Sequence, residues 1–549
     1  MSKNTKECCI NSEIMNDFFL QSSNEVEATR YTCNPDLLYN GDKFNFTACT
    51  PNDVYKSVIK IKSNAVGFDA VNLKFIKLIL PDVLQVLTHI FNHIICTCVY
   101  PLKWKVANIV PVAKNNSANK PEDFRPISIL SAISKVFEKL LSNQIVQHLE
   151  ANNLLSEHQS GFRLGRSCNS AILNVMEDIR RNFDSGQMSI LILIDFSKAF
   201  DTVNYNILLD KLKNYFGFDT FSCKLIESYL SFRTQAVISN NKTSTLKQIR
   251  SGVPQGSILG PIFFSMFIND IVKCCKNSQI HMYADDVQIY FSRPPAKAEI
   301  LAISMNEDLS SIYAWSQENN LAINSSKTKA MSICHTQIGP QPSLFLNGTH
   351  ISFVESIKNL GFFVNGKLNC ITHVNHVVSK IYGVLRKLWF SASFLSVNLK
   401  LKLVRTLIVP FLTYMANVYG ELDSGSTRKL QIAINNCARY IYNKRKFDNI
   451  SEFSIKILGC SCSSYFTIRN LLLLHSIIYT KEPAYLYNKL SFLKSKRTCN
   501  IRIPKHNFLS TSRQFFVSAV KHWNSLPNHL KLECRSSVFK AGISLIYNV

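Results

Sequence analysis

Three carboxylates have the residue type and spacing to bind divalent metal ions. Asp195 follows the apolar run LILI, and Asp285 and Asp286 separate QIHMY from VQIYF, two segments that alternate in hydrophobicity. These flanks predict a tight β-hairpin with the acidic pair at its turn. A hairpin that buries its flanks while holding like charges at one end needs cations nearby. We therefore expect two Mg²⁺ ions at this position, with Mn²⁺ as the alternative.

Two metal ions bridged by carboxylates can activate an attacking 3′-hydroxyl and stabilise a leaving pyrophosphate. Asp195 and Asp285 are the expected bridging ligands, and Asp286 is expected to contribute more weakly. An isolated Asp-Asp pair is more often an ordinary turn or surface feature. The assignment therefore depends on the motifs around it.

An ordered set of motifs surrounds the carboxylates. The middle part of the chain contains LILIDFSKAFDTVNY from Leu191, SGVPQGSILGP from Ser251, YADD from Tyr283 and NSSKTKAM from Asn324. Upstream lie WKVANIVPVAKNN from Trp104, DFRPISIL from Asp123 and HQSGFRLGRSC from His158. Towards the C-terminus follow SIKNLGFFVNGKL from Ser356, LIVPFLTYMANVYG from Leu407 and WNSLP from Trp523. Together they resemble the reverse transcriptases of non-LTR (LINE-type) retrotransposons of the jockey and CR1-like group.

The resemblance implies an α+β fold, a right-hand polymerase with fingers, an antiparallel palm sheet and a thumb, followed by a mainly helical C-terminal domain. The expected boundaries are 1–49 for a linker or disordered remnant, 50–190 for the fingers and the start of the palm, 191–366 for the palm, 367–450 for the thumb and 451–549 for the C-terminal extension. Polymerases of this kind usually carry an N-terminal endonuclease, and 49 residues are too few for one. We expect the nicking activity to come from a missing N-terminal region or in trans.

The resemblance also assigns roles to individual residues. The metal ligands would be Asp195, Asp285, Asp286 and the backbone carbonyl of Phe196, and Lys327 would donate a proton to pyrophosphate as a general acid. Nucleotide binding would fall to Lys114, Arg125, Phe200, Gln255 and Gly256. Template or primer contacts would fall to Arg163, Arg166 and Tyr283.

Each of these assignments has an ordinary structural alternative. Phe200 would exclude a 2′-hydroxyl from the sugar site, or it is a core phenylalanine. Gln255 and Gly256 would form the floor under the nascent base pair, or Pro254 and Gly256 simply make a turn. The basic residues would grip phosphates, or they are solvated surface cations. Trp523 of WNSLP is more often a core residue than a base-stacking platform.

Composition favours a polyanionic partner. The 549 residues carry a formal net charge of +25 and a pI near 9.4, and clustered Lys and Arg bind phosphates by releasing counterions. We expect an RNA template, a DNA primer or target and deoxynucleoside triphosphates as partners. No clean apolar run of about 18 residues is apparent, so no membrane contact is expected. The N-terminus lacks the apolar segment of a signal peptide, so an intracellular protein, of the cytoplasm and nucleus, is expected. The 17 cysteines are scattered through a long chain, which favours reduced thiols, and no close pair joins a second pair at zinc-finger spacing.

The predicted function is RNA-directed DNA polymerisation from a primer 3′-hydroxyl, with target-primed reverse transcription in the cell. Three alternatives remain. A group II intron-type maturase shares YADD, and a viral RNA-dependent RNA polymerase shares the carboxylate chemistry but more often has a glycine before its Asp pair. A catalytically decayed or truncated nucleic-acid-binding protein derived from a polymerase would keep the fold without the reaction.

Overall fold

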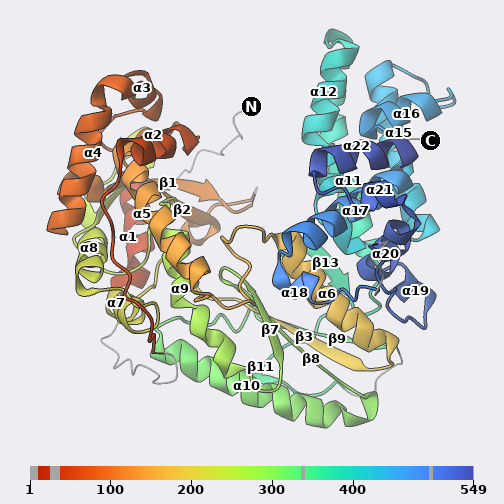
Figure 1. Cartoon of the computed structure of the whole chain (residues 1–549), viewed down its shortest axis with the longest axis horizontal. Coiled ribbons are helices and arrows are strands. Elements are labelled where there is room, and N and C mark those ends of the chain that lie inside the picture. Colours follow the sequence, from red (N-terminus) through yellow and green to blue (C-terminus); the bar gives the residue numbers. More distant parts are fainter. Residues whose placement is uncertain are drawn as a thin grey trace. The chain divides into compact units, whose positions relative to one another are not determined.

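The computed structural model describes residues 10–24, 38–115, 117–335, 341–419, 421–493 and 499–547 (Figure 1). The chain divides into two compact units. The first unit comprises 1–162, 196–274 and 310–324, and the second comprises 163–195, 275–309 and 325–549. We expected contiguous domains, whereas both units are assembled from separate segments, and the chain passes from one unit to the other between Asp195 and Phe196.

The first unit is built on a mixed sheet of five short strands. β1 (Val106–Ala113) pairs antiparallel with β2 (Phe124–Ile129) and parallel with β4 (Thr234–Ser239), and β4 also pairs with β5 (Lys242–Thr243) and β6 (Lys247–Gln248). Its helices are α1 (Ser12–Asn24), α2 (Pro51–Lys60), α3 (Leu73–Leu78), α4 (Leu80–Thr97), α5 (Ala132–Ala151), α7 (Tyr205–Asn214), α8 (Thr220–Leu230) and α9 (Gly260–Phe267). The 21-residue α10 (Ala298–Glu318) contains the point where the chain changes units.

Helix α1 corrects the prediction that residues 1–49 are linker or disordered. Met15 and Phe19, one helical turn apart, are buried in a core with Ile109 and Val237 of the sheet. Buried polar contacts fix the same helix, because Asn16 donates from Nδ2 to Ser244 Oγ at 3.0 Å and accepts from Gln235 Nε2 at 3.0 Å. Burial of this apolar face explains why so short a segment is helical. Residues 1–9 and 25–37 of the predicted linker lie outside the described residues.

The second unit contains a four-stranded antiparallel sheet in the order β7-β8-β3-β9 (Figure 1). Its strands are β3 (Met188–Ile194), β7 (Gln279–Tyr283), β8 (Asp286–Arg293) and β9 (Lys329–Ile333). β3, at the centre, is almost wholly buried, which explains its unbroken apolar run. Helix α6 (Cys168–Asp184) packs on this sheet, and this arrangement agrees with the predicted α+β fold and antiparallel palm sheet.

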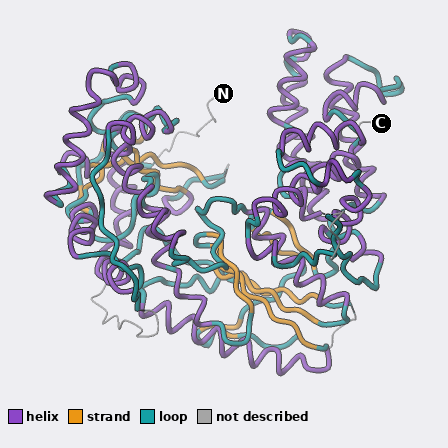
Figure 2. Tube along the Cα trace, in the orientation of Figure 1, coloured by secondary structure: helices purple, strands orange, loops and turns teal. Residues whose placement is uncertain are grey.

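The rest of the second unit is mainly helical (Figure 2). Two small hairpins follow, β10 (Phe345–Leu346) with β11 (Thr349–His350) and β12 (Ser356–Asn359) with β13 (Phe362–Asn365), and beyond them the described residues form no further strand. The helices are α11 (Ile371–Trp389), α12 (Val397–Leu407), α13 (Val409–Thr413), α14 (Ala416–Tyr419), α15 (Ser424–Tyr442), α16 (Ser451–Leu458), α17 (Cys462–Thr480), α18 (Ala484–Tyr487), α19 (Leu509–Ser512), α20 (Phe515–Ser525), α21 (Asn528–Lys531) and α22 (Ser536–Tyr547). Trp523 lies in their core, fully buried, and donates from Nε1 to the Cys499 carbonyl at 2.8 Å. The core alternative for this residue is confirmed.

One helical stretch of the described residues, Ser451–Thr480, is long and apolar enough to cross a membrane by length and composition. This differs from our expectation that no such run exists. Half of its most apolar window is buried, and α17 packs against α20 and α22. A core helix passes the same test, so the stretch is weak evidence for a membrane segment.

The role of α1 in the fold can be tested with two neighbouring residues. Met15 is fully buried, whereas Ile14 is 57% exposed. We expect Met15→Ala to lower the free energy of unfolding by about 2–5 kcal/mol because it leaves a cavity, and Ile14→Ala to change it by about 0.5 kcal/mol or less. Urea unfolding of the two variants beside the wild type measures both values. Equal effects would show that α1 does not pack as described.

Candidate active site: strand-end carboxylates and a stapled glycine loop

The carboxylate hairpin of the second unit is a two-residue turn, as predicted. Tyr283 of β7 pairs with Asp286 of β8, which leaves Ala284 and Asp285 at the turn. Asp195 comes directly after Ile194, whose partner in β8 is Val287. Asp195 and Asp286 therefore occupy facing positions at the same end of the β3–β8 ladder. Residues that face each other across an antiparallel pair point to the same side of the sheet.

The described residues contain no group of three or more His, Cys, Asp or Glu side chains that could hold a metal ion. The predicted convergence of Asp195, Asp285 and Asp286 into one cluster is therefore not confirmed. The register does provide two facing carboxylates, and carboxylate oxygens are the ligands that hard divalent cations prefer.

Lys327 lies next to this strand end. Its Nζ is 3.6 Å from Asp195 Oδ2, with both side chains largely in solvent, at 67% and 39% exposure. An ion pair so open to water contributes little to stability. Its position beside a candidate metal ligand fits the predicted role in proton transfer, which stays a prediction.

Two tyrosines and a cysteine line the hairpin, and our sequence analysis assigned only Tyr283. Burial and the nearby Cys168 thiol raise the pKa of both Tyr283 and Tyr414. Tyr414 donates to the Leu360 carbonyl at 2.5 Å, which ties the β12–β13 turn to this region. Partial burial raises the pKa of Tyr414 to about 12, and the nearby Asp286 carboxylate acts in the same direction. Tyr414 lies inside the LIVPFLTYMANVYG motif, but nothing in that motif marks this tyrosine over its neighbours.

In the first unit, residues 251–256 form a loop held by backbone contacts. Gly252 N–H donates to the Val203 carbonyl and Val253 N–H to the Phe200 carbonyl, each at 2.8 Å, and the Gln255 carbonyl accepts from Ser128 N–H of β2 at 2.7 Å. Both loop glycines have positive φ, 86° and 126°. A Cβ at Gly252 would meet the Asp201 carbonyl, and one at Gly256 the Ser128 carbonyl, each at 2.5 Å. Only glycine permits these approaches.

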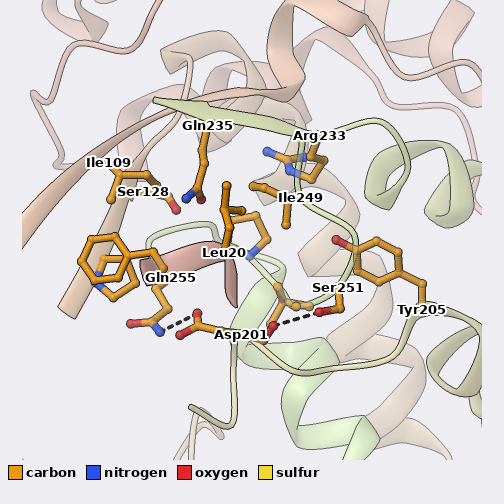
Figure 3. Close-up of a pocket in the computed structure, with 15 residues that line it drawn as sticks. Leu20, Ile109, Ser128, Asp201, Tyr205, Arg233, Gln235, Ile249, Ser251 and Gln255 are labelled. Carbon is orange, nitrogen blue, oxygen red and sulfur yellow. Dashed lines mark hydrogen bonds between the residues drawn. The ribbon is translucent and has the colours of Figure 1, made fainter. Parts of the chain in front are cut away.

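Asp201 completes this loop (Figure 3). Its Oδ1 accepts from Gln255 Nε2 at 2.9 Å, and its backbone carbonyl accepts from Ser251 Oγ at 3.1 Å. Burial raises the pKa of Asp201 to about 6, although the Gln255 bond and the cations Lys198 and Lys114 act to lower it. The carboxylate therefore fixes the amide of Gln255, the residue predicted to contact the nascent base pair.

A small cavity of about 40 Å³ lies behind the loop (Figure 3). Leu20 of α1, Ser128, Tyr205 and Arg233 line it together with the loop residues. Arg233 is buried and donates from Nη1 to the Tyr229 carbonyl, but its Nε and Nη2 have no hydrogen-bond partner. A polar cavity of this size is large enough for a water molecule. It is too small for a nucleotide.

The other residues predicted for nucleotide binding lie in the same unit. Phe200 is half-buried, and its ring stacks on Phe264 with centroids 4.4 Å apart and planes 20° apart. Lys114 and Arg125 are exposed and lie on the β1–β2 hairpin, as predicted. Lys114 Nζ donates to the Glu122 carbonyl at 2.6 Å across that hairpin. Phe196 is buried, and its backbone pairs with Ile323.

Arg163 and Arg166 belong to the second unit. The guanidinium of Arg166 lies 5.4 Å from the ring centroid of Tyr485, in the C-terminal region, and Arg166 N–H donates to the Arg163 carbonyl. This cation–π contact gives Arg166 a structural role that the sequence did not indicate. The template contacts predicted for the two arginines stay predictions.

Comparison with known proteins agrees with these motifs. Residues 112–364 match the family described as reverse transcriptase (RNA-dependent DNA polymerase). Similar proteins from Drosophila melanogaster are the probable RNA-directed DNA polymerase from transposon X-element, 28% identical, and the RNA-directed DNA polymerase from mobile element jockey, 27% identical. These matches cover 78% and 70% of this chain, and 48% and 43% of the relatives. The chain thus spans less than half the length of these relatives.

Among solved structures, telomerase from Candida albicans with a fragment of telomeric RNA shows a TM-score of 0.33 at 11% identity, covering 71% of this chain and 67% of that chain. Apo telomerase from Candida tropicalis shows a TM-score of 0.33 at 12% identity, covering 50% of this chain and 55% of that chain.

The raised pKa of Asp201 predicts a pH dependence of stability. The folded chain binds this proton more tightly than the unfolded chain, whose aspartates titrate near about 3.9, so this group's contribution to stability falls as pH rises from about 4 to 6. Asp201→Asn removes this pH-dependent contribution to stability and keeps the shape of the side chain. We expect the melting temperature of the variant to rise relative to wild type as pH increases from 4 to 7.

The matched control is Asp42→Asn, because Asp42 is exposed and precedes α2. It should follow the wild-type pH profile. Parallel pH profiles for Asp201→Asn and the wild type would contradict the assignment.

Proposed function

Because residues 112–364 form a reverse transcriptase domain related to those of non-LTR retrotransposons, we propose that this chain adds deoxynucleotides to a primer 3′-hydroxyl as an RNA-directed DNA polymerase. The single observation that carries the proposal is the strand-end pair Asp195 and Asp286, with Asp285 at the adjacent turn, inside the matched domain. Carboxylate oxygens are the ligands that divalent cations such as Mg²⁺ prefer, and this supports the proposal.

The carboxylates Asp195 and Asp285 are the proposed metal ligands, with Asp286 and the Phe196 carbonyl in support. Two Mg²⁺ ions, when bound, would lower the pKa of the primer hydroxyl and stabilise the leaving pyrophosphate. Lys327 has an exposed ammonium beside Asp195 and would supply a proton to that leaving group. To hold the ions, the carboxylates of Asp195, Asp285 and Asp286 would have to move closer together. Catalytic groups commonly reach their working geometry only when substrate binds.

Residues of the first unit are proposed to bind the nucleotide. The exposed cations Lys114 and Arg125 on the β1–β2 hairpin would bind its phosphates, and Arg supplies a bidentate fork. Gln255 is held by Asp201 and by Ser128, so its amide is in place before substrate arrives. Preorganised polar groups of this kind avoid the cost of ordering them during the reaction.

The proposed partners are an RNA template, a DNA primer and deoxynucleoside triphosphates. We propose target-primed synthesis, in which the primer is a nicked genomic strand and the nicking endonuclease is supplied by a longer form of the protein or in trans. This activity would place the chain inside the cell, in the cytoplasm and nucleus. The second candidate is a non-catalytic nucleic-acid binder, which the formal net charge of +25 would also suit.

Substitution of the strand-end carboxylates separates the two candidates. We expect Asp195→Ala and Asp285→Ala each to reduce Mg²⁺-dependent extension of a primed homopolymer RNA by about 10²-fold or more, because stabilising groups at developing charge are lost. Affinity for the RNA template should stay within about twofold of wild type, since phosphate contacts by Lys and Arg dominate binding. Exposed Asp42→Ala is the control and should extend normally. Folded wild-type protein that binds RNA without extending the primer would favour the non-catalytic binder.

Phe200 is the proposed steric gate against ribonucleotides. We expect Phe200→Ala to lower the preference for deoxynucleotides over ribonucleotides by about 10-fold or more, because loss of a steric contact is typically worth this much. Competitive incorporation of the two nucleotide types measures the ratio. The control is Phe162→Ala, because Phe162 is 51% exposed and its ring contacts that of Phe200 edge-on at 6.4 Å. An unchanged ratio in Phe200→Ala would assign the ring to packing on Phe264 alone.

A further inference from the structure

The C-terminal end of α11, in the second unit, exposes a group of large side chains around a shallow groove. The groove has a volume of about 430 Å³ and is lined by Tyr382, Leu385, Arg386, Trp389 and Phe390, which we call the α11 aromatic surface. Trp389 is 53% exposed and Phe390 is 85% exposed. Large apolar side chains gathered on one exposed face usually mark a binding surface.

The platform beneath this surface is rigid. The rings of Trp389 and Tyr440 of α15 lie 5.6 Å apart, and Lys400 Nζ lies 5.4 Å from the Tyr440 ring centroid. Asn436 Nδ2 donates to Tyr382 Oη at 2.8 Å. The indole and phenol are therefore held in place by α15 before any ligand arrives, and binding to them would require little ordering of side chains.

The chain segment that contains this surface is strongly basic, which favours an anionic ligand. Residues 356–447 contain fourteen Lys or Arg and only two acidic residues, Glu421 and Asp423. This segment of 92 residues therefore carries a net charge of +12, about half of the +25 of the whole chain. Arg386 and Lys387 lie in the last turn of α11 and are both exposed. Cations at a helix C-terminus also stabilise the helix, but that effect does not account for the exposed rings beside them.

Within the second unit, the surface lies at the end of α11 that is remote from β13. His373, near the start of α11, accepts from the Phe363 N–H of β13, whereas the aromatic surface is at the opposite end of the 19-residue helix. At about 1.5 Å per residue, the helix places that end roughly 27 Å away from its start.

We propose that the α11 aromatic surface is a second nucleic-acid site that binds single strands by base stacking. Unpaired bases expose their faces to aromatic rings, whereas a duplex hides its bases within the stack. Arg386 and Lys387 supply the charge for the phosphates of the same strand. The site goes beyond the proposed polymerase function, since it needs neither metal nor nucleotide.

Binding of the full-length chain to a fluorescein-labelled 15-nucleotide oligo(dT), without Mg²⁺ or nucleotides, tests the proposal. We expect Trp389→Ala combined with Phe390→Ala to weaken binding by about 10-fold or more, since each stacked base contributes on this scale. Phe390→Ala alone should weaken it less and cannot disturb the fold, because the ring is 85% exposed. Phe345→Ala, an exposed ring on β10, is the matched control and should bind as wild type.

Tryptophan fluorescence gives a second readout. Trp389 is the most exposed of the four tryptophans, so stacking on oligo(dT) should quench the emission, and Trp389→Phe should abolish that quenching while keeping most of the affinity. Unchanged oligo(dT) affinity in the double variant would overturn the proposal. If the double variant lost as much affinity for a blunt-ended DNA duplex as for oligo(dT), the proposal would be overturned and the surface assigned to duplexes. If it lost affinity only for anionic lipid vesicles, the proposal would be overturned and the surface assigned to lipid. Primer extension by the double variant should match wild type, so failure of the polymerase proposal leaves this result interpretable.

Discussion

The close approach of backbone to backbone at Gly252 and Gly256 is the constraint on which the first unit depends. Each glycine lets a carbonyl come within 2.5 Å of the place where a Cβ would lie. These approaches bring residues 200–203, the 251–256 loop and β2 together. Where the segments meet, the Asp201 carboxylate accepts a hydrogen bond from the Gln255 side-chain amide. Any side chain at either glycine would force the three segments apart. The positions of Phe200, the predicted sugar gate, and of Gln255, in the predicted base-pair floor, therefore depend on the same close backbone packing.

In the second unit the corresponding constraint is strand register. Ile194 pairs with Val287, and Tyr283 with Asp286, so the central strand and the hairpin end together. A slip of one residue would move every side chain of the strand to the other face. The almost wholly buried β3 opposes such a slip, because a slip would leave its apolar side chains without their places in the core. Burial of this strand thus determines where Asp195 emerges.

The sequence predicted the parts of the site that depend on local pattern. Alternating hydrophobicity gave the carboxylate hairpin, and the β1–β2 hairpin with Lys114 and Arg125 followed from its own motifs. Features that depend on contacts distant in sequence were missed. Helix α1 is stabilised by a sheet whose strands β1 and β4 lie about 90 and 220 residues further along the chain, and its local signal is limited to Met15 and Phe19 one turn apart. The contact of Arg166 with Tyr485 spans still more of the chain. The prediction of contiguous domains missed the segmented units for the same reason.

The turn of the carboxylate hairpin carries an uncommon conformation. Ala284 has a φ of 57°, in the left-handed region that an alanine adopts only at an energetic cost. Glycine or asparagine would relax this turn, and both are the usual residues of two-residue hairpin loops. A conformation that costs free energy persists only where its surroundings impose it, and such residues cluster at functional sites. Ala284 is buried, so its methyl group fills space that glycine would leave empty. It also restricts the backbone of the turn more than glycine would. The strained alanine therefore limits the positions open to Asp285, which is the property that the proposed metal-binding role of this turn would require.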